Sequence, residues 1–313
     1  MQRLFGALAA ALFVIPAQAA DPIKMVVPFA AGGPVDALAR IVAAEIGPRL
    51  QSDVVVENRG GAGGLLAVEQ VARSAPDGRT ILFASVGAFV ITNALKPQPG
   101  YDQLKTFAPV ARIGAAPTLF IVKADAPFKT MADLIAKAKT DSKMSYGSAG
   151  AGTTMHIAAE QLNVSAGTKI THVPYRGIAP ALNDIMGGHI NFLNGDITVL
   201  YPLVQQGTIR ALAVAGTQRS SLLPNVPTAL ELGYKDVYME NWYGALVPAA
   251  TPPDVVAKLE AAVMDAVKNP DVWAKISANG VYAPQDAKTF RAQIEKDIAY
   301  WGAEIKKLGI TAE

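Results

Sequence analysis

The chain has 313 residues, of which 51% are hydrophobic and 17% are charged, with 28 lysines and arginines against 26 aspartates and glutamates. This composition excludes an intrinsically disordered chain, which needs fewer apolar and more charged residues. The formal charge is only +2 and no long run of like charges occurs, which argues against a nucleic-acid-binding protein. The length exceeds what one hydrophobic core usually fills, so we expect two lobes.

The first twenty residues have the order of a secretory signal peptide. Arg3 is followed by an apolar run from Leu4 to Pro16 and then by Ala17-Gln18-Ala19 and Ala20, which fit a cleavage site. The apolar run is shorter than the ~20 residues that a membrane-spanning helix needs. We therefore expect residues 1–20 to be removed and the mature protein to be free in a bacterial periplasm.

Beyond this leader, short apolar runs alternate with segments of helical periodicity. The first strands are predicted at 23–29, 53–57 and 80–84, and the first helices at 35–46 and 65–73. This alternating order is typical of a parallel, doubly wound α/β sheet.

The alternation continues towards the C-terminus. Strands are predicted at 119–123, 145–147, 170–173, 190–193, 209–215 and 242–247, and helices at 131–140, 153–162, 179–186, 254–268 and 288–307. The last two helices need a sheet to cover, and the N-terminal strands offer one. We therefore predict a discontinuous first lobe, 21–118 plus 235–313, and a second lobe, 119–234, inserted between its two parts.

Three glycine-rich turns, at residues 29–36, 147–154 and 175–180, each open a predicted helix. Glycine lets the backbone come close to a ligand, and the first free N–H groups of a helix attract an anion. Such turns can also be plain connections, but three of them after strands favour an anion site in a cleft between the lobes. Asp36 is expected to accept N–H groups at its helix start, which is a structural role.

Signatures of catalysis and of cofactor binding are missing. Ser148 lacks the glycine spacing of a nucleophile elbow. His156, His172 and His189 stand apart without a metal-ligand partner at helical spacing, so a structural role is expected for each. Residues 61–66 lack the last glycine of the dinucleotide fingerprint, and the chain has no cysteine. We expect no catalytic residue, no metal and no cofactor.

Six stretches, taken in order, match one family pattern: residues 26–36, 55–64, 75–78, 147–156, 172–177 and 226–228. Through them the sequence resembles the tripartite tricarboxylate transporter substrate-binding family, also called the Bug receptors. The resemblance implies a type II periplasmic binding protein, with two α/β lobes that close on an organic anion and deliver it to a membrane permease. Presentation of the ligand to a sensor kinase, or a periplasmic enzyme acting on a carboxylic acid, are the alternatives. A monomer is expected.

The resemblance also implies which residues hold the ligand. In this family backbone amides and small hydroxyls bind the inner carboxylate, which implicates Phe29, Gly32 and Gly33 on the first lobe and Gly152, Thr153 and Thr154 on the second. The full predicted ligand-binding set adds Ala30, Ser85, Val86, Ser148, Tyr175 and Asp196.

Two departures from the family pattern bear on the ligand. Where the family has a Phe-Asp pair, this chain has Asn194-Gly195, with Asp196 one place later, so amino-acid ligands are disfavoured unless Asp196 substitutes. The loop that ends at Phe89 is more apolar than in the family. Phe89 either lines an apolar distal pocket with Phe29, which would suit an aromatic or longer aliphatic acid, or faces the core.

Overall fold

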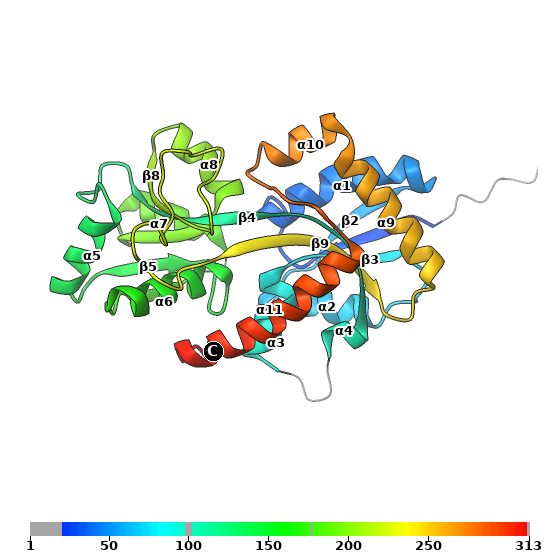
Figure 1. Ribbon diagram of the computed structural model, residues 1–313, viewed down its shortest axis with the longest axis horizontal. Helices are drawn as coiled ribbons and strands as arrows, with labels where there is room; N and C mark the ends of the chain where they lie inside the picture. Colours follow the sequence, from blue (N-terminus) through cyan, green and yellow to red (C-terminus); the bar gives the residue numbers. More distant parts are fainter. Residues whose placement is uncertain (1–20, 98–101, 176, 312–313) are drawn as a thin grey trace, which may run out of the picture.

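Two α/β lobes, joined by the long strands β4 (Phe107–Lys123) and β9 (Glu240–Pro248), make up the computed structural model (Figure 1). The structure describes residues 21–97, 102–175 and 177–311, so the predicted signal peptide and Arg176 lie outside the described residues. The architecture confirms the predicted α/β class with two doubly wound lobes. Within these ranges, none of the helices has the length and apolar character needed to cross a membrane.

The first lobe is built on three parallel strands, in the order β2 (Val54–Asn58), β1 (Ile23–Val27) and β3 (Thr80–Ser85). The last three residues of β1 are fully buried. A central strand of a parallel sheet is covered on both faces, which explains its continuous apolar run. On the far side of β3, β9 pairs antiparallel and leads to β4.

Helix α1 (Pro34–Leu50) leads from β1 to β2 and begins with a proline, at a position where no backbone N–H is needed. Its buried side includes the apolar positions predicted from helical spacing, such as Leu38, Val42 and Ile46. The remaining short elements of this part of the chain are η1 (Ala62–Gly64), α2 (Leu65–Ala72), η2 (Gly87–Ile91), α3 (Thr92–Leu95) and α4 (Gln103–Thr106).

Strand β4 belongs to both lobes. From Phe107 to Pro117 it pairs antiparallel with β9, and from Thr118 to Lys123 it pairs with β7 and β8. The strand therefore passes from one sheet to the other between Pro117 and Thr118.

The second lobe repeats the parallel arrangement. Its strands β7 (Phe192–Asp196), β5 (Ser145–Ser148) and β6 (Thr171–Pro174) are parallel and lie in this order, and β8 (Ile209–Ala215) pairs with β4. The helices of this lobe are α5 (Met131–Thr140), α6 (Thr154–Ala166), α7 (Ile178–Gly187) and α8 (Ile197–Gln205).

The C-terminal part of the chain returns to the first lobe. Helix α9 (Pro253–Lys268) packs against α1, and α10 (Pro270–Ser277) follows it. After the short strand β10 (Gln285–Asp286), which pairs with β4, helix α11 (Ala287–Leu308) contacts η2, α3 and then α6 of the second lobe (Figure 1). The exact lobe boundaries stay a prediction.

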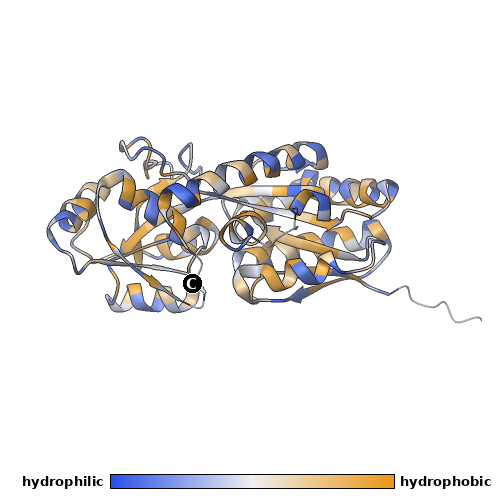
Figure 2. Cartoon of the chain, turned by 90° about the horizontal axis from the view of Figure 1, so that it is seen from below, coloured by the Kyte–Doolittle hydropathy of each residue, from blue (hydrophilic) through white to orange (hydrophobic). Residues whose placement is uncertain are grey.

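Hydropathy follows this layering. Figure 2 shows mainly hydrophobic strands inside helices that carry hydrophilic residues on their outer sides. Most of the largest fully buried side chains, such as Phe83, Phe120 and Tyr243, come from the strands, and helices cover them.

Candidate functional site

The predicted site residues lie where parallel strands end. Phe29 follows β1, Ser85 closes β3, Ser148 closes β5, Tyr175 follows β6 and Asp196 closes β7. Open α/β sheets place ligands at the carboxyl ends of their strands. The fold therefore brings the predicted segments of each lobe to the strand edge where ligand binding is expected.

The two lobes touch at the start of α6. A Cβ atom built on Gly87 of η2 would lie 3.4 Å from Cγ2 of Thr154, and one built on Gly152 would lie 2.2 Å from Cδ1 of Leu95 in α3. Gly152 also has a φ of +73°, which L side chains rarely adopt. The β5–α6 turn, residues 149–153, is thus in direct contact with the first lobe, and glycine is required at 152.

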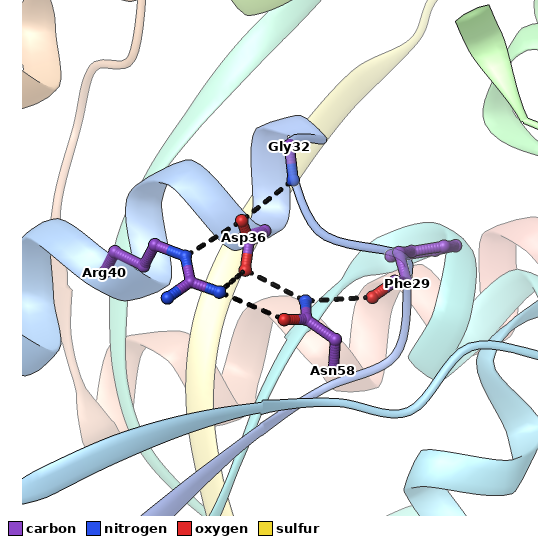
Figure 3. Close-up of polar contacts among 5 residues, drawn as sticks. All are labelled: Phe29, Gly32, Asp36, Arg40 and Asn58. Atoms are coloured by element: carbon purple, nitrogen blue, oxygen red, sulfur yellow. Dashed lines mark hydrogen bonds and ion pairs between the residues drawn. The ribbon is translucent and has the colours of Figure 1, made fainter.

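In the β1–α1 turn, the side chain of Asp36 holds the backbone in place (Figure 3). Its carboxylate accepts the N–H of Gly32 and Nδ2 of Asn58, each at 2.9 Å, and forms an ion pair with Arg40 at 3.0 Å. Nδ2 of Asn58 also donates to the carbonyl of Phe29, at 3.0 Å. Burial raises the pKa of Asp36, but the hydrogen bonds from Arg40, Gly32 and Asn58 outweigh it, so the net pKa is below its usual value.

This network leaves part of the turn accessible. The amide of Gly32 is used by Asp36, while Ala30 and Gly32 remain exposed and Gly33 is half-buried. The side chain of Phe29 is half-buried and points away from the carboxylate in Figure 3. Backbone atoms of residues 30–33 therefore face outward on a turn whose shape is held by Asp36.

The β5–α6 turn is held by side chains of its own. The hydroxyl of Ser148, which is fully buried, donates to the carbonyl of Gly150 at 2.9 Å and accepts its N–H at 3.1 Å. The hydroxyl of Thr153 donates to the same carbonyl at 2.8 Å and accepts the N–H of His156 as the N-cap of α6. The N–H of Gly152 donates to Nδ1 of His156, at 3.0 Å.

Free donors remain at the start of α6. Within the described residues, the hydroxyl of Thr154 and the N–H groups of Thr154 and Met155 have no protein acceptor. These groups carry the positive end of the helix dipole, which favours an anion. The arrangement can bind a carboxylate with neutral groups alone.

Two histidines stack directly behind this turn. The rings of His156, on α6, and His172, on β6, are nearly parallel with centroids 3.9 Å apart, and Tyr146 stacks on His172 at 5.0 Å. Nε2 of His172 lies 2.7 Å from the hydroxyl of Ser148. Burial lowers the pKa of both histidines to about 4, and in His172 the neighbouring ring adds to this while Glu160 opposes it. Both histidines are thus held by stacking and by polar contacts with the β5–α6 turn.

Asp196 forms the centre of a buried polar cluster between the lobes. Its carboxylate accepts the N–H of Thr198 and Nδ2 of Asn241, each at 3.0 Å, and the hydroxyl of Tyr243. Burial raises the pKa of Asp196, although these donors oppose the effect. Thr118 lies directly opposite Asp196 in the β4–β7 pair.

Sequence reasoning missed the residues that surround Asp196. The hydroxyl of Thr118 and both polar atoms of the Asn194 side chain are buried without a hydrogen-bond partner among the described residues. Asn241 and Tyr243, two polar residues at alternate positions of the apolar strand β9, were the available signal, because alternate residues share one face of a strand.

The structure decides between the two alternatives for Phe89 and shows which group the hydroxyl of Tyr175 contacts. Phe89 is 1% exposed and packs edge-on against Phe107 and Trp242, with centroids at 5.4 and 6.4 Å, so it belongs to the core and lines no ligand pocket. The hydroxyl of Tyr175 donates to Asp184 of α7. Burial and Asp184 raise the pKa of Tyr175 to about 12.

Metal-binding geometry is not found in the part of the chain that the structure describes. There, no group of three or more His, Asp and Glu side chains is arranged to hold an ion.

Comparisons with known proteins agree on one family. The family model described as "Tripartite tricarboxylate transporter family receptor" matches residues 38–310. The solved periplasmic binding protein BugD is 32% identical, with 93% of this chain and 99% of BugD covered and a TM-score of 0.84.

Two further similar structures were solved with ligands. MatC from Rhodopseudomonas palustris, with bound malate, is 30% identical, with 91% of this chain and 98% of MatC covered and a TM-score of 0.83. Rpa4515 from R. palustris, with adipate, is 30% identical, with 93% of this chain and 98% of that protein covered and a TM-score of 0.87.

Proposed function

Because this chain belongs to the tripartite tricarboxylate transporter receptor family of periplasmic solute-binding proteins, which are not enzymes, we propose that it binds a small aliphatic mono- or dicarboxylate between its lobes. The observation that carries this proposal is the set of free donors at the start of α6, placed where the first lobe touches the second. An anion bound there meets groups from both lobes at once, which stabilises the closed arrangement.

Two groups of residues act at the site in this proposal, drawn from the predicted ligand set with Met155 added. The backbone of residues 30–33 and the donors at Thr154 and Met155 contact the carboxylate. Ser148, Gly152 and Thr153 act by holding the β5–α6 turn, since their polar groups already bond within it.

The ligands of similar structures and two residues of this chain support an aliphatic acid. Malate and adipate, bound in the similar structures, indicate the size range. The core position of Phe89 removes the basis for an aromatic preference. Asp196 has its carboxylate oxygens engaged by three donors, so it offers little to a ligand ammonium group.

We propose that the protein delivers its ligand to a membrane permease, which its membership of a transporter receptor family supports. We propose that the protein acts in the periplasm after removal of residues 1–20, as a monomer, with lobes formed by 21–118 plus 235–313 and by 119–234. The closed, ligand-bound form is the one that docks on the permease, since only ligand binding makes the closed form abundant.

The test is ligand-dependent stabilisation with malate and adipate as probes. A ligand present at 100 times its dissociation constant should raise the free energy of unfolding by about 2.7 kcal/mol. Thr154→Val, which keeps the side-chain shape and removes the hydroxyl, should weaken binding by about tenfold, the worth of one hydrogen bond to a charged group. The exposed Thr171→Val on β6 is the matched control and should bind as the wild type does.

Two results would contradict the proposal. One is the absence of a thermal shift with a wide panel of aliphatic acids, using protein shown by mass spectrometry to carry no ligand. The other is an equal affinity for Thr154→Val and the wild type at every ligand tested.

A further inference from the structure

We propose that His156 is a positioning residue that holds the β5–α6 turn in its anion-binding shape, and that acid releases the ligand by removing this contact. The inference rests on the proposed function, because it assigns a role to the turn that carries the anion site. It concerns a histidine that makes no contact with the ligand itself.

The contact with Gly152 defines the state of His156. Nδ1 of the ring accepts the N–H of Gly152 at 3.0 Å, so the ring is neutral with its proton on Nε2. Only 9% of His156 is exposed. Gly152 has a φ of +73° and lies against Leu95 of α3, so a side chain at this position would be both strained and crowded. The ring therefore fixes the direction of the peptide two residues before the free donors of α6.

The second imidazole ties the other end of the turn to the same stack. His172 lies 3.9 Å from His156, centroid to centroid, with 7° between the ring planes. Its Nε2 contacts the hydroxyl of Ser148, which in turn brackets both the N–H and the carbonyl of Gly150. Residues 148–152 are thus held at both ends by one pair of stacked rings.

The groups around the His156 and His172 rings offer little to stabilise a positive charge on either ring. Tyr146 on β5 stacks on His172, and its hydroxyl contacts Oε1 of Glu160 on α6. Nδ2 of Asn163 also contacts that oxygen, at 3.3 Å. Among the described residues, Glu160 is the carboxylate that acts on the stack, and it is already engaged by neutral donors.

Protonation would change the contact from attractive to repulsive. A proton on Nδ1 of His156 turns the acceptor of the Gly152 N–H into a second donor. The new charge also lies against the ring of His172, which cannot be protonated as well without like-charge repulsion. Since burial lowers the pKa of both rings to about 4, the contact survives at neutral pH and is lost at strongly acid pH.

The experiment compares two substitutions at one position. His156→Asn keeps an acceptor near the place of Nδ1 but does not titrate, and His156→Leu removes the acceptor at similar size. The exposed His189→Asn is the control. Affinities for adipate and malate are measured by calorimetry from pH 7.5 to 4, and each value is divided by that of the control, which cancels protonation of the acid itself.

We expect His156→Asn to bind within about threefold of the control at neutral pH and to become relatively tighter by about tenfold towards pH 4. His156→Leu should bind about tenfold more weakly than the control at neutral pH. The inference is overturned if all three variants follow one pH profile, or if His156→Leu binds as tightly as the control.

A second measurement separates this inference from the proposed function. The amide resonance of Gly152 in the ligand-free wild type should move with an inflection near that of the His156 ring, and this movement should be absent in His156→Asn. If no carboxylate binds but the amide titrates, the proposed function fails while the histidine contact stands. If a carboxylate binds and the amide does not titrate, the histidine inference alone is wrong.

Discussion

The backbone N–H of Gly32 and the carboxylate of Asp36 are 2.9 Å apart, so a side chain from the first turn of α1 closes the turn that precedes it. The same carboxylate also contacts Arg40 and Asn58. One buried group thereby sets the shape of a loop that we assign to ligand binding.

Removing this carboxylate should cost stability. Asp36→Ala leaves the N–H of Gly32 and the amide of Asn58 without their acceptor, and the free energy of unfolding should fall by about 1.5–3 kcal/mol. Arg40→Met removes only a half-exposed partner and should cost less than about 1 kcal/mol. Urea unfolding at neutral pH measures both. Equal losses for the two variants would show that Asp36 acts mainly through the ion pair.

The difference between wild type and Asp36→Ala should depend on pH. The folded-state pKa of Asp36 lies below its ordinary value of 3.8, so its contribution is present above that pH and is lost as pH falls through the lower, folded-state pKa. The free energies of unfolding of wild type and Asp36→Ala should therefore become similar only in strong acid.

Gly152 and Leu95 give a test of the contact between the lobes. Gly152→Ala places a methyl group 2.2 Å from Cδ1 of Leu95, at a backbone angle that alanine disfavours. Ligand affinity should fall at least about tenfold, corresponding to roughly 1–3 kcal/mol of crowding. The double variant with Leu95→Ala should recover part of that loss, because the backbone strain remains. No recovery would mean that the crowding is unimportant.

The hydroxyl of Tyr243 should stabilise the junction of the lobes. Tyr243→Phe removes one of the donors to Asp196 and should lower the free energy of unfolding by about 1–3 kcal/mol. Tyr201→Phe, on the half-buried face of α8, is the control and should have little effect.

The penalty at Tyr243 should shrink in acid. The pKa of Asp196 is raised by burial, so the folded state holds a proton more tightly than the unfolded state does, and stability gained from protonating it increases as pH falls through the raised pKa. A penalty that grew in acid would contradict this assignment.

The histidine pair should make the whole fold less stable in mild acid. Both rings have a folded-state pKa of about 4 against an ordinary value of 6.5, so between these values the unfolded chain binds more protons and stability falls as pH is lowered. We expect the wild type to lose about 2–4 kcal/mol more than the double variant His156→Asn, His172→Asn between pH 6.5 and 4.5. Thermal unfolding measures this across the pH range. If the stabilities of wild type and double variant fell in parallel with pH, the rings would have no such effect.

Much of the fold could be predicted from local pattern, but β4 could not. The strands at the N-terminus and helix α1 follow apolar runs and a proline start that are visible in the sequence. Residues 107–118 contain Pro109, Gly114 and Pro117, which are typical of loops. They form a strand because β9 pairs along them with register shifts near Pro109 and Gly114, a partner far away in the chain.

The site divides in the same way. The turns after β1 and β5 could be located from glycine spacing and from the family resemblance. The sequence could not predict that Asp36 accepts the N–H of Gly32 or that His156 accepts the N–H of Gly152, because spacing does not determine where a side chain points. The polar cluster around Asp196 depends on β9 meeting β7 across β4, which only the assembled sheet brings about.

Strand β4 has 17 residues and belongs to both sheets. The chain therefore cannot be cut within β4 into two units that each fold alone. A break near Pro117 would leave each fragment with an unpaired sheet edge, which invites aggregation. Folding of either half must await the same shared segment, so the two halves should melt in a single cooperative transition. New termini in a circular permutant would have to be placed elsewhere, in surface turns where they interrupt no pairing between strands.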